Sequence, residues 1–391
     1  MRHRIFQGFA WAAVAALMLS TACVDNTDGS ITAGSAPVYL YDGGTTSVLV
    51  WKDVSTLYDL GNGGTAPAAD RTLNGTVIAT IGTLAWGGMA LDTSIDRLYL
   101  VSATGTLVRV KSASTQSGAP STSDAASFNL TRKLTDSTFG QISAQNSYLY
   151  LTEYTSSESQ IWVIPASALE SAGGTITSTT SGVSLIAPPS AENRAYGLAV
   201  LKNGTASANL FAYFEGGNSY TDTLNNKTYS NQRIRCGGAS SGFLTEVTKQ
   251  VIWGSTASTS DSTRLGKWGC LALDYMNDDL FVAVHNTDAG KPASTGSVLV
   301  FATSAFSSTD GLDRAPDRTL AGGDDLRIIA HAGSKDWLLG ANGVSAVTSG
   351  DPDTGTNKLW IWKAPSAGDT HVTLSLGSNV LVQGLALDGS Q

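Results

Sequence analysis

The sequence predicts an all-β protein that closes into a six-bladed β-propeller behind a cleaved signal peptide. Three observations predict it: an apolar N-terminal run that ends at a cysteine, a short motif that recurs along the chain, and complementary strand fragments at the two ends of the repeat region. We expect a signal peptide over residues 1–22, a flexible tether over 23–36 and the propeller over 37–391.

The chain begins with a basic stretch and an apolar run that reaches Leu19. This run is shorter than the roughly 20 apolar residues of a membrane-spanning helix, and its flanks are typical of a secretory signal. Its end, Leu19-Ser20-Thr21-Ala22-Cys23, resembles the bacterial lipobox, in which the cysteine is lipidated and becomes the new N-terminus. The lipobox usually has Leu where this chain has Ser20. An ordinary cleaved signal with an unmodified Cys23 is the alternative.

The segment after Cys23 is rich in Ser, Thr, Gly and Asp without a regular period, as expected of a flexible tether. Several acyl chains on one residue would anchor it stably, at about 0.8 kcal/mol per buried CH₂ group. The resemblance to Gram-negative signals implies the outer membrane, because Val24 rather than Asp follows the cysteine. We therefore expect an exported protein that is lipid-anchored to the cell envelope.

Composition narrows the class of partner. The formal net charge is −8 with 14% charged residues, so the chain lacks the excess of positive charge that nucleic-acid binding needs. Forty-two Gly residues, with much Ser and Thr, suit a β-rich exported protein with many turns. The expected partners are the membrane, through the lipid, and an envelope protein or polysaccharide.

The motif Gly-Leu-Ala-Leu-Asp near the C-terminus recurs along the chain. The copies are Gly384–Asp388, Gly88–Asp92, Cys270–Asp274 and Gly197–Val200, with degenerate units that begin near Gly140 and Ile328. Alternating strands separated by turn residues follow each internal copy. Six starts, about 50–70 residues apart, predict six four-stranded blades. A seventh blade within 206–263 is the alternative.

The two ends of the repeat region complete each other. Gly384–Asp388 is a first strand without a second, and Val38–Tyr41 and Ser47–Trp51 are a second and a third without a first. Joining them completes one blade and removes an open sheet edge. The matching segments Ala69–Leu73 and Pro316–Leu320 both read Asp-Arg-Thr-Leu and are expected to be outer fourth strands.

Strand pairs such as Gly88–Asp92 with Asp96–Val101 resemble the NHL and YVTN-type propeller repeats. The resemblance covers residues 37–391 and implies the fold. It implies no particular reaction, because such propellers host binders, scaffolds and enzymes. The Asp that ends each first strand, as at Asp92, Asp274 and Asp388, is expected to be a turn residue that accepts backbone N–H bonds.

Six residues precede the first strands and are expected to ring one mouth of the central channel: Trp86, Phe139, Tyr196, Trp268, Arg327 and Gln383. This ring is aromatic, with one cation and no carboxylate. It therefore suits stacking against a sugar or another flat ligand better than it suits a metal. The alternative is that these aromatic side chains fill the core between blades.

No metal or cofactor is expected. His285 and His331 lie in separate units and are expected to be surface or satisfied residues rather than ligands. The segment Asp351–Asn357 alternates oxygen ligands like a calcium loop, but it lacks the closing Glu and is interpreted as a hairpin loop, with Ca²⁺ as the alternative. Cys236 and Cys270 could pair in an oxidising compartment; otherwise Cys270 is a small core residue.

The absence of a clustered catalytic set in the sequence favours a non-enzymatic binding or scaffold propeller. The alternative is a hydrolase or lyase that acts on a sugar or lactone in the channel. Such an enzyme would use carboxylates near the channel, for which Glu153, Glu192 and Glu215 are the candidates.

Overall fold

The computed structural model divides the chain into two compact units, Met1–Thr32 and Ala33–Gln391. The described residues all belong to the second unit: 36–188, 192–203, 207–217, 220–222, 227–229, 233–238, 250–251, 265, 268–274, 276–285, 297–306, 314–322, 326–332, 335–341, 357–377 and 380–388. The predicted signal, Cys23 and the calcium-like loop up to residue 356 lie outside them. Within the described residues, no helix is long and apolar enough to cross a membrane.

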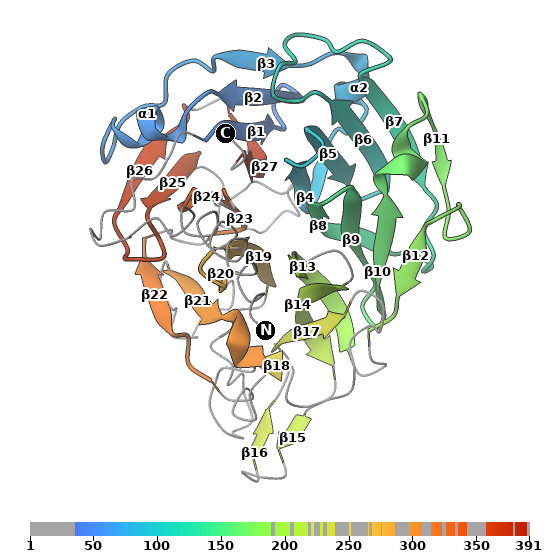
Figure 1. The fold of residues 1–391 in the computed structure, drawn as a ribbon, viewed down its shortest axis with the longest axis vertical. Helices are drawn as coiled ribbons and strands as arrows, with labels where there is room; N and C mark the ends of the chain where they lie inside the picture. The colour runs from blue at the N-terminus through green and yellow to red at the C-terminus, as the bar shows by residue number, and fades with distance from the viewer. Residues whose placement is uncertain are drawn as a thin grey trace, which may run out of the picture. The chain divides into compact units, whose positions relative to one another are not determined.

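The second unit consists of six antiparallel sheets around a common centre (Figure 1). With the strands of each blade given from the inside outward, blade 1 has β27 (Val382–Leu387), β1 (Val38–Asp42), β2 (Ser47–Trp51) and β3 (Arg71–Leu73), and blade 2 has β4 (Leu84–Asp92), β5 (Arg97–Ser102), β6 (Thr106–Lys111) and β7 (Ala125–Leu130). Blade 3 has β8 (Thr138–Gln145), β9 (Tyr148–Tyr154), β10 (Ser159–Pro165) and β12 (Ser184–Ile186), and blade 4 has β13 (Glu192–Asn203), β14 (Ser207–Gly217), β17 (Arg233–Gly238) and β18 (Gln250–Val251). Blade 5 has β19 (Trp268–Asp274), β20 (Asp279–His285), β21 (Ser297–Ala302) and β22 (Arg318–Ala321), and blade 6 has β23 (Ile328–His331), β24 (Trp337–Ala341), β25 (Lys358–Lys363) and β26 (His371–Ser375).

Six blades form a closed ring. The innermost strands contact one another in the cycle β27, β4, β8, β13, β19, β23 and back to β27. Each pair of neighbouring blades encloses its own hydrophobic core cluster, which gives six clusters for six interfaces. The predicted six-bladed propeller is therefore confirmed. The seven-bladed alternative is wrong, because these six innermost strands close the ring without a seventh. The described strands within 206–263 belong to blade 4, apart from a separate hairpin of β15 (Tyr220–Asp222) with β16 (Lys227–Tyr229).

Closure occurs where the end fragments predicted it. β27 pairs antiparallel with β1, with Val38 opposite Leu387 and Leu40 opposite Leu385, and β1 continues into β2 and β3. The last strand of the chain is thus the innermost strand of the first blade. Leu385 is 3% exposed and packs in the core between blades 1 and 6, so the closing strand belongs to the core as well as to the sheet.

The recurring motif has a packing cause. In β19, Leu271 and Leu273 face blade 4, whereas Ala272, between them, faces blade 6. β4 repeats this order, because Met89 belongs to the core with blade 1 and Ala90 to the core with blade 3. Innermost strands converge on the axis, so a small side chain on one face lets the neighbouring strand approach.

The repeated Asp-Arg-Thr-Leu segments are outer strands, β3 and β22, as expected. Their arginines reach the next blade: Arg71 Nη1 donates to the carbonyl of Gln116 at 2.7 Å, and Arg318 Nε donates to that of Pro365 at 3.2 Å. Arg109 donates similarly from the third strand of blade 2 to the carbonyl of Leu169 in blade 3. These bonds tie the outer parts of neighbouring blades together.

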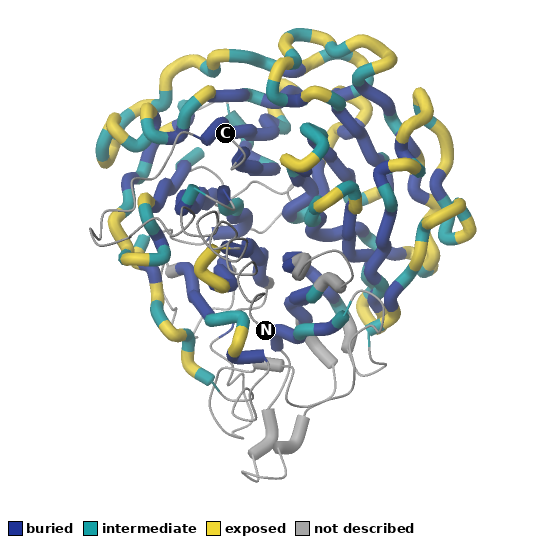
Figure 2. The backbone as a smooth tube through the Cα atoms, in the orientation of Figure 1, coloured by how far each residue is buried: buried dark blue, intermediate teal, exposed yellow. Residues whose placement is uncertain are grey.

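Short helices, 3₁₀ turns and one further strand lie on the rim, where most of the exposed residues are found (Figure 2). They are helices α1 (Val54–Tyr58) and α2 (Thr76–Ala79), the 3₁₀ turns η1 (Ala166–Leu169) and η3 (Thr303–Phe306), and strand β11 (Gly173–Ile176). β11 comes from the chain of blade 3 but pairs parallel with β7 of blade 2, which makes that sheet five-stranded. No sequence pattern predicted this exchange.

We predict that Leu385→Ala destabilises the propeller by about 2–5 kcal/mol, because it leaves a cavity in the core that the closing strand shares with blade 6. Leu60→Ala is the matched control, since Leu60 is 44% exposed, and its effect should stay within about 0.5 kcal/mol. The midpoint of denaturant unfolding measures both. Equal midpoints would contradict a structural role for the closing strand.

Candidate functional site: the central channel

The central channel holds a cavity of about 110 Å³ that is lined by the innermost strands of all six blades. This is room for a few water molecules, at about 30 Å³ each. Gln141, Ser143 and His331 are its polar lining residues, and no carboxylate lines it within the described part of the chain. Each innermost strand is a sheet edge, so its inward N–H and C=O groups need other partners.

Gln141 supplies such partners across the channel. From β8 of blade 3, its Oε1 accepts hydrogen bonds from the backbone N–H groups of Leu198 in blade 4 and Leu271 in blade 5, at 2.8 and 2.9 Å. Its Nε2 donates to the carbonyl of Leu271 at 2.7 Å. One side chain, 5% exposed, therefore links three blades and blocks the channel at its own level.

Close packing completes the block. A Cβ atom added at Gly87 would lie 2.9 Å from Gln141 Cγ and 3.0 Å from the sulfur of Cys270, and Gly87 has a φ of +65°. A side chain there would therefore be strained and crowded. Burial raises the pKa of the Cys270 thiol to about 12, so this thiol is an inert core group.

We call the end of the channel where the innermost strands begin the upstream end, and Trp86 and Arg327 lie at or just before the starts of two of these strands. Trp86 of blade 2 and Arg327 of blade 6 meet there across blade 1, with the guanidinium carbon 5.4 Å from the centre of the indole ring. Trp86 is half-buried, and Arg327 is 3% exposed. Gln383 accepts a hydrogen bond from the backbone N–H of Leu84 at 3.1 Å, which joins blades 1 and 2.

The other three predicted mouth residues differ in their surroundings. Phe139 is fully buried in the core between blades 2 and 3, edge-on to Trp162, so its expected place at the mouth is wrong and the core alternative holds. Tyr196 is 7% exposed, with its ring centre 4.8 Å from that of Tyr154. The backbone of Trp268 begins β19, and its side chain lies outside the described atoms.

Register irregularities explain why residues before the motif leave the regular strand pattern. β13 shifts register between Ala195 and Gly197, and β27 shifts opposite Tyr41 and Asp42. The extra residues at these shifts are Tyr196 and Gln383. Bulges re-aim side chains and are frequent beside functional sites. The upstream end is therefore the part of the channel where strand geometry turns side chains away from the sheets.

Glu153, a candidate for channel catalysis, is a structural residue. It is fully buried in blade 3, and its Oε1 accepts from the backbone N–H groups of Lys133 and Leu134 at 2.9 and 3.0 Å and from the Ser137 hydroxyl at 2.5 Å. Its Oε2 accepts from the indole N–H of Trp162 at 2.8 Å. Four donors therefore occupy this carboxylate. The side chains of the other two candidates, Glu192 and Glu215, lie outside the described atoms.

The strand-ending aspartates act as turn residues, as expected. Asp92 accepts from the backbone N–H of Ser94 at 3.1 Å and from that of Ser147, in the next blade, at 2.7 Å. Asp274 accepts from the backbone N–H groups of Met276 and Asn277 at 2.8 and 3.1 Å. The bond from Ser147 to Asp92 also joins blade 3 to blade 2.

One cluster went unnoticed in the sequence. His331 Nε2 lies 3.7 Å from Asp274 Oδ2 and 4.0 Å from Asp336 Oδ1, and its ring stacks on Phe281 with the centres 5.2 Å apart. Burial by itself would raise the pKa of Asp336, but His331 and Ser366 outweigh it and hold this pKa below its usual value. His331 and Asp336 flank one turn of blade 6, but Asp274 comes from blade 5, so local spacing alone could not reveal the cluster.

The cysteines are not joined by a disulfide. Cys236 lies in β17 of blade 4 and Cys270 in β19 of blade 5, and the alternative role of Cys270 as a small core residue holds. The side chain of His285 lies outside the described atoms.

No protein-family model and no curated protein sequence matches the chain. The solved structures that it resembles include a functionally unknown protein from Desulfotomaculum acetoxidans, 10% identical, with a TM-score of 0.46 over 92% of this chain and 100% of the other. AztD from Citrobacter koseri is 11% identical, with a TM-score of 0.40 over 90% and 98%. The Cps50 (Swd1) β-propeller domain from Myceliophteria thermophila is 9% identical, with a TM-score of 0.42 over 85% and 81%. Such distant likeness carries nothing about what this chain binds or does.

We predict that Gln141→Met, which keeps the length of the side chain, destabilises the protein by about 2 kcal/mol or more. It leaves buried backbone groups of Leu198 and Leu271 without their partner. Gln116→Met, on the half-exposed rim, is the matched control and should change little. Thermal melting of the two variants decides the matter, and equal losses would show that the cross-channel bonds contribute nothing.

Proposed function

We propose that this chain is an exported lipoprotein whose NHL- or YVTN-like propeller binds a protein or glycan partner at the cell envelope without catalysing a reaction. Support for export and anchoring comes from the basic and apolar start of the chain and from Cys23 at the end of the apolar run. Support for the propeller as a rigid platform comes from its closed ring of six interlocked cores.

The observation that carries the non-enzymatic proposal is the channel blocked by Gln141. A reaction in the channel would need open space and convergent ionisable groups. The described lining has no carboxylate, and Glu153 is occupied by four donors. Binding is then left to the surfaces at the channel ends and to the loops that surround them.

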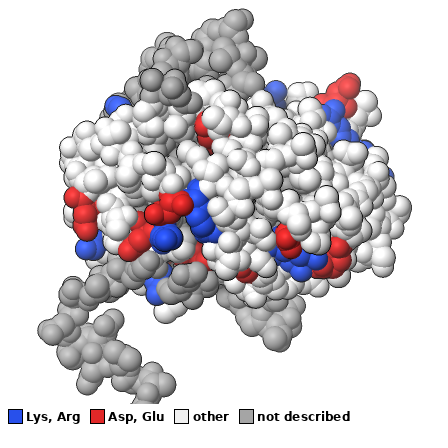
Figure 3. Space-filling view, turned by 90° about the horizontal axis from the view of Figure 1, so that it is seen from above, with Lys and Arg blue, Asp and Glu red and all other residues white. Residues whose placement is uncertain are grey.

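The upstream end is the favoured place for a flat ligand such as a sugar ring. Trp86 is half-buried there and keeps part of its surface open, and the guanidinium of Arg327 from blade 6 lies over the indole. On the face that Figure 3 shows, the charged residues form small mixed clusters between wide uncharged areas. Such a surface suits polar, sequence-tolerant contacts better than electrostatic capture of a polyanion.

Cys23→Ser should abolish incorporation of labelled palmitate and release the protein from the membrane fraction, because the acyl chains have no other attachment point in the proposal. Cys236→Ser is the control and should label and sediment like the wild type. Membrane retention of Cys23→Ser without label would refute the lipid anchor.

Binding itself is tested with the full chain in detergent, on an array of envelope glycans and against solubilised envelope proteins. We expect a saturable partner, with Trp86→Ala weakening a glycan partner at least tenfold through loss of the stacking surface. Tyr148→Ala is the control, because Tyr148 is 40% exposed and begins β9, beyond the other end of the innermost strand of blade 3. No saturable partner of either kind would count against the proposal.

A further inference from the structure

The cluster of Asp274, His331 and Asp336 lies in the interface between blades 5 and 6. Asp274 ends β19, His331 ends β23, and Asp336 directly precedes β24. Their side chains are 1%, 1% and 6% exposed. One ligating atom from each lies within 4.8 Å of the others, which brings two carboxylates and one imidazole to a single point.

The interface between blades 2 and 3 is built differently at the same place. There, Asp92 accepts a hydrogen bond directly from the backbone N–H of Ser147. The carbonyl of Ser147 accepts from the N–H of Ala166, and in blade 6 the carbonyl of Asp336 accepts in the same way from the N–H of Ala364. Ser147 therefore stands where blade 6 has Asp336. Aspartate is the usual residue at this place, as Asp96 in blade 2 and Asp278 in blade 5 show, and what the blade 5–6 interface adds is His331 beside two carboxylates.

Two carboxylates and one imidazole therefore meet, buried, in this interface. Beside the cluster, Asp279 forms an ion pair with Arg318, so that arginine is already matched with a carboxylate. Buried carboxylates are stable when they are paired or coordinate a metal, and a divalent ion between the three side chains would serve both carboxylates.

The distances approach those around a small divalent ion. Zinc binds His nitrogen at about 2.0–2.1 Å and carboxylate oxygen at about 2.0–2.2 Å in a tetrahedral arrangement, so two ligand atoms on one ion lie about 3.4 Å apart. The separations from His331 Nε2 are 3.7 and 4.0 Å, and the separation of the two carboxylate atoms is within 4.8 Å. Side-chain movements of up to about 1.4 Å would bring all three onto one ion.

Supporting hydrogen bonds and access are present as well. Asn277 Nδ2 donates to Asp274 Oδ2 at 2.7 Å, and the Ser366 hydroxyl donates to Asp336 Oδ2 at 2.5 Å. Bonds of this kind orient ligating carboxylates in metal sites. The central cavity reaches His331, which gives an ion a route from the channel.

We propose that Asp274, His331 and Asp336 bind one divalent transition-metal ion of the zinc class, which fastens blade 5 to blade 6. One nitrogen and two oxygen ligands suit Zn²⁺ and its neighbours better than Ca²⁺, which prefers oxygen alone. The ion is structural and takes part in no reaction.

The test uses the purified full chain after dialysis against a chelator. Titration calorimetry with Zn²⁺ should give one saturable site, and Co²⁺ should give the visible absorption of a nitrogen- and oxygen-ligated ion. Added Zn²⁺ should raise the melting temperature, because an ion that binds only the folded state stabilises it. Absence of a stoichiometric site overturns the proposal. So does a melting temperature that responds to pH but not to Zn²⁺, because a proton on His331 would then be the missing cation.

The decisive variant is His331→Leu, because Leu273 holds the corresponding position before the strand-ending Asp in blade 5. The interface should therefore accept leucine while the site is lost. Asp336→Ser, which copies Ser147 of blade 3, is the second variant in case His331→Leu does not fold. His371→Ala is the control, since His371 begins β26 and its ring packs beside Trp362. Loss of the site in the first two and retention in the control supports the proposal; a folded ligand variant that still binds one ion overturns it.

Discussion

The pairing of β27 with β1 is the constraint on which the remaining structure depends. Each blade is apolar on both faces and buries them only between two neighbours. Without the closing strand, the cores on either side of blade 1 would lose Leu385, Leu387 and Ala386, and two sheet edges would open. The ring is therefore one cooperative object, although each blade is built from local hairpins.

Closure fixes how closely the innermost strands approach, and this in turn decides the chemistry of the channel. Convergent strands need alanine on one face and present unpaired backbone groups toward the axis. Gln141 satisfies several of these groups at once and fills the passage. A channel used in this way for stability has little space left for a substrate. This is the physical reason that the proposed binding lies at the ends.

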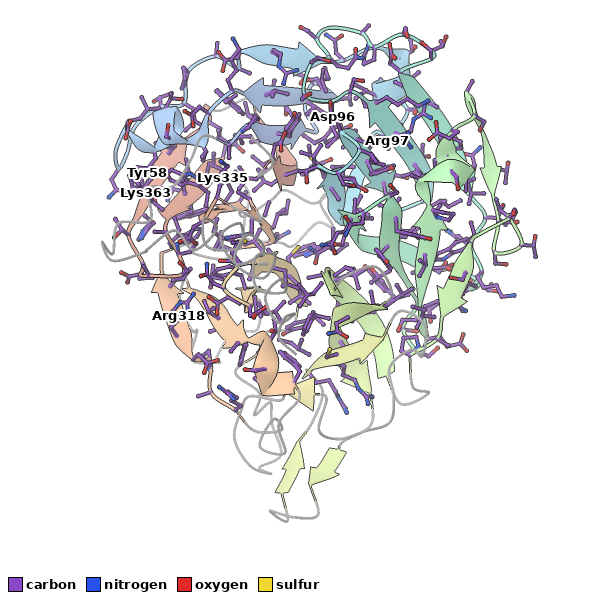
Figure 4. All side chains as sticks on the ribbon, in the orientation of Figure 1. Tyr58, Asp96, Arg97, Arg318, Lys335 and Lys363 are labelled. Atoms are coloured by element: carbon purple, nitrogen blue, oxygen red, sulfur yellow. The ribbon has the colours of Figure 1, made fainter. Side chains whose placement is uncertain are left out.

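Polar groups between blades give each interface its own character. On the rim, Arg71 and Arg318 each donate a hydrogen bond to a carbonyl of the next blade. Tyr58 and Lys363 make a cation–π contact, with the ammonium 5.7 Å from the ring centre (Figure 4). These contacts are partly exposed, so each contributes modestly. The buried set at His331 differs in kind, because buried ionised groups are stable only with close partners or a bound metal ion.

The sequence by itself determined the features that depend on local periodicity. Alternation predicted the strands, the recurring apolar motif predicted six blades, and the incomplete ends predicted which strand closes the ring. Asp-Arg-Thr-Leu located two outer strands. Tertiary structure alone decided which side chains meet across the ring. Gln141 binds Leu271, 130 residues away, Phe139 enters the core rather than the mouth, and Asp274 meets His331 and Asp336. Such contacts depend on how closely six strands converge after closure, and a periodic pattern carries no information about that distance.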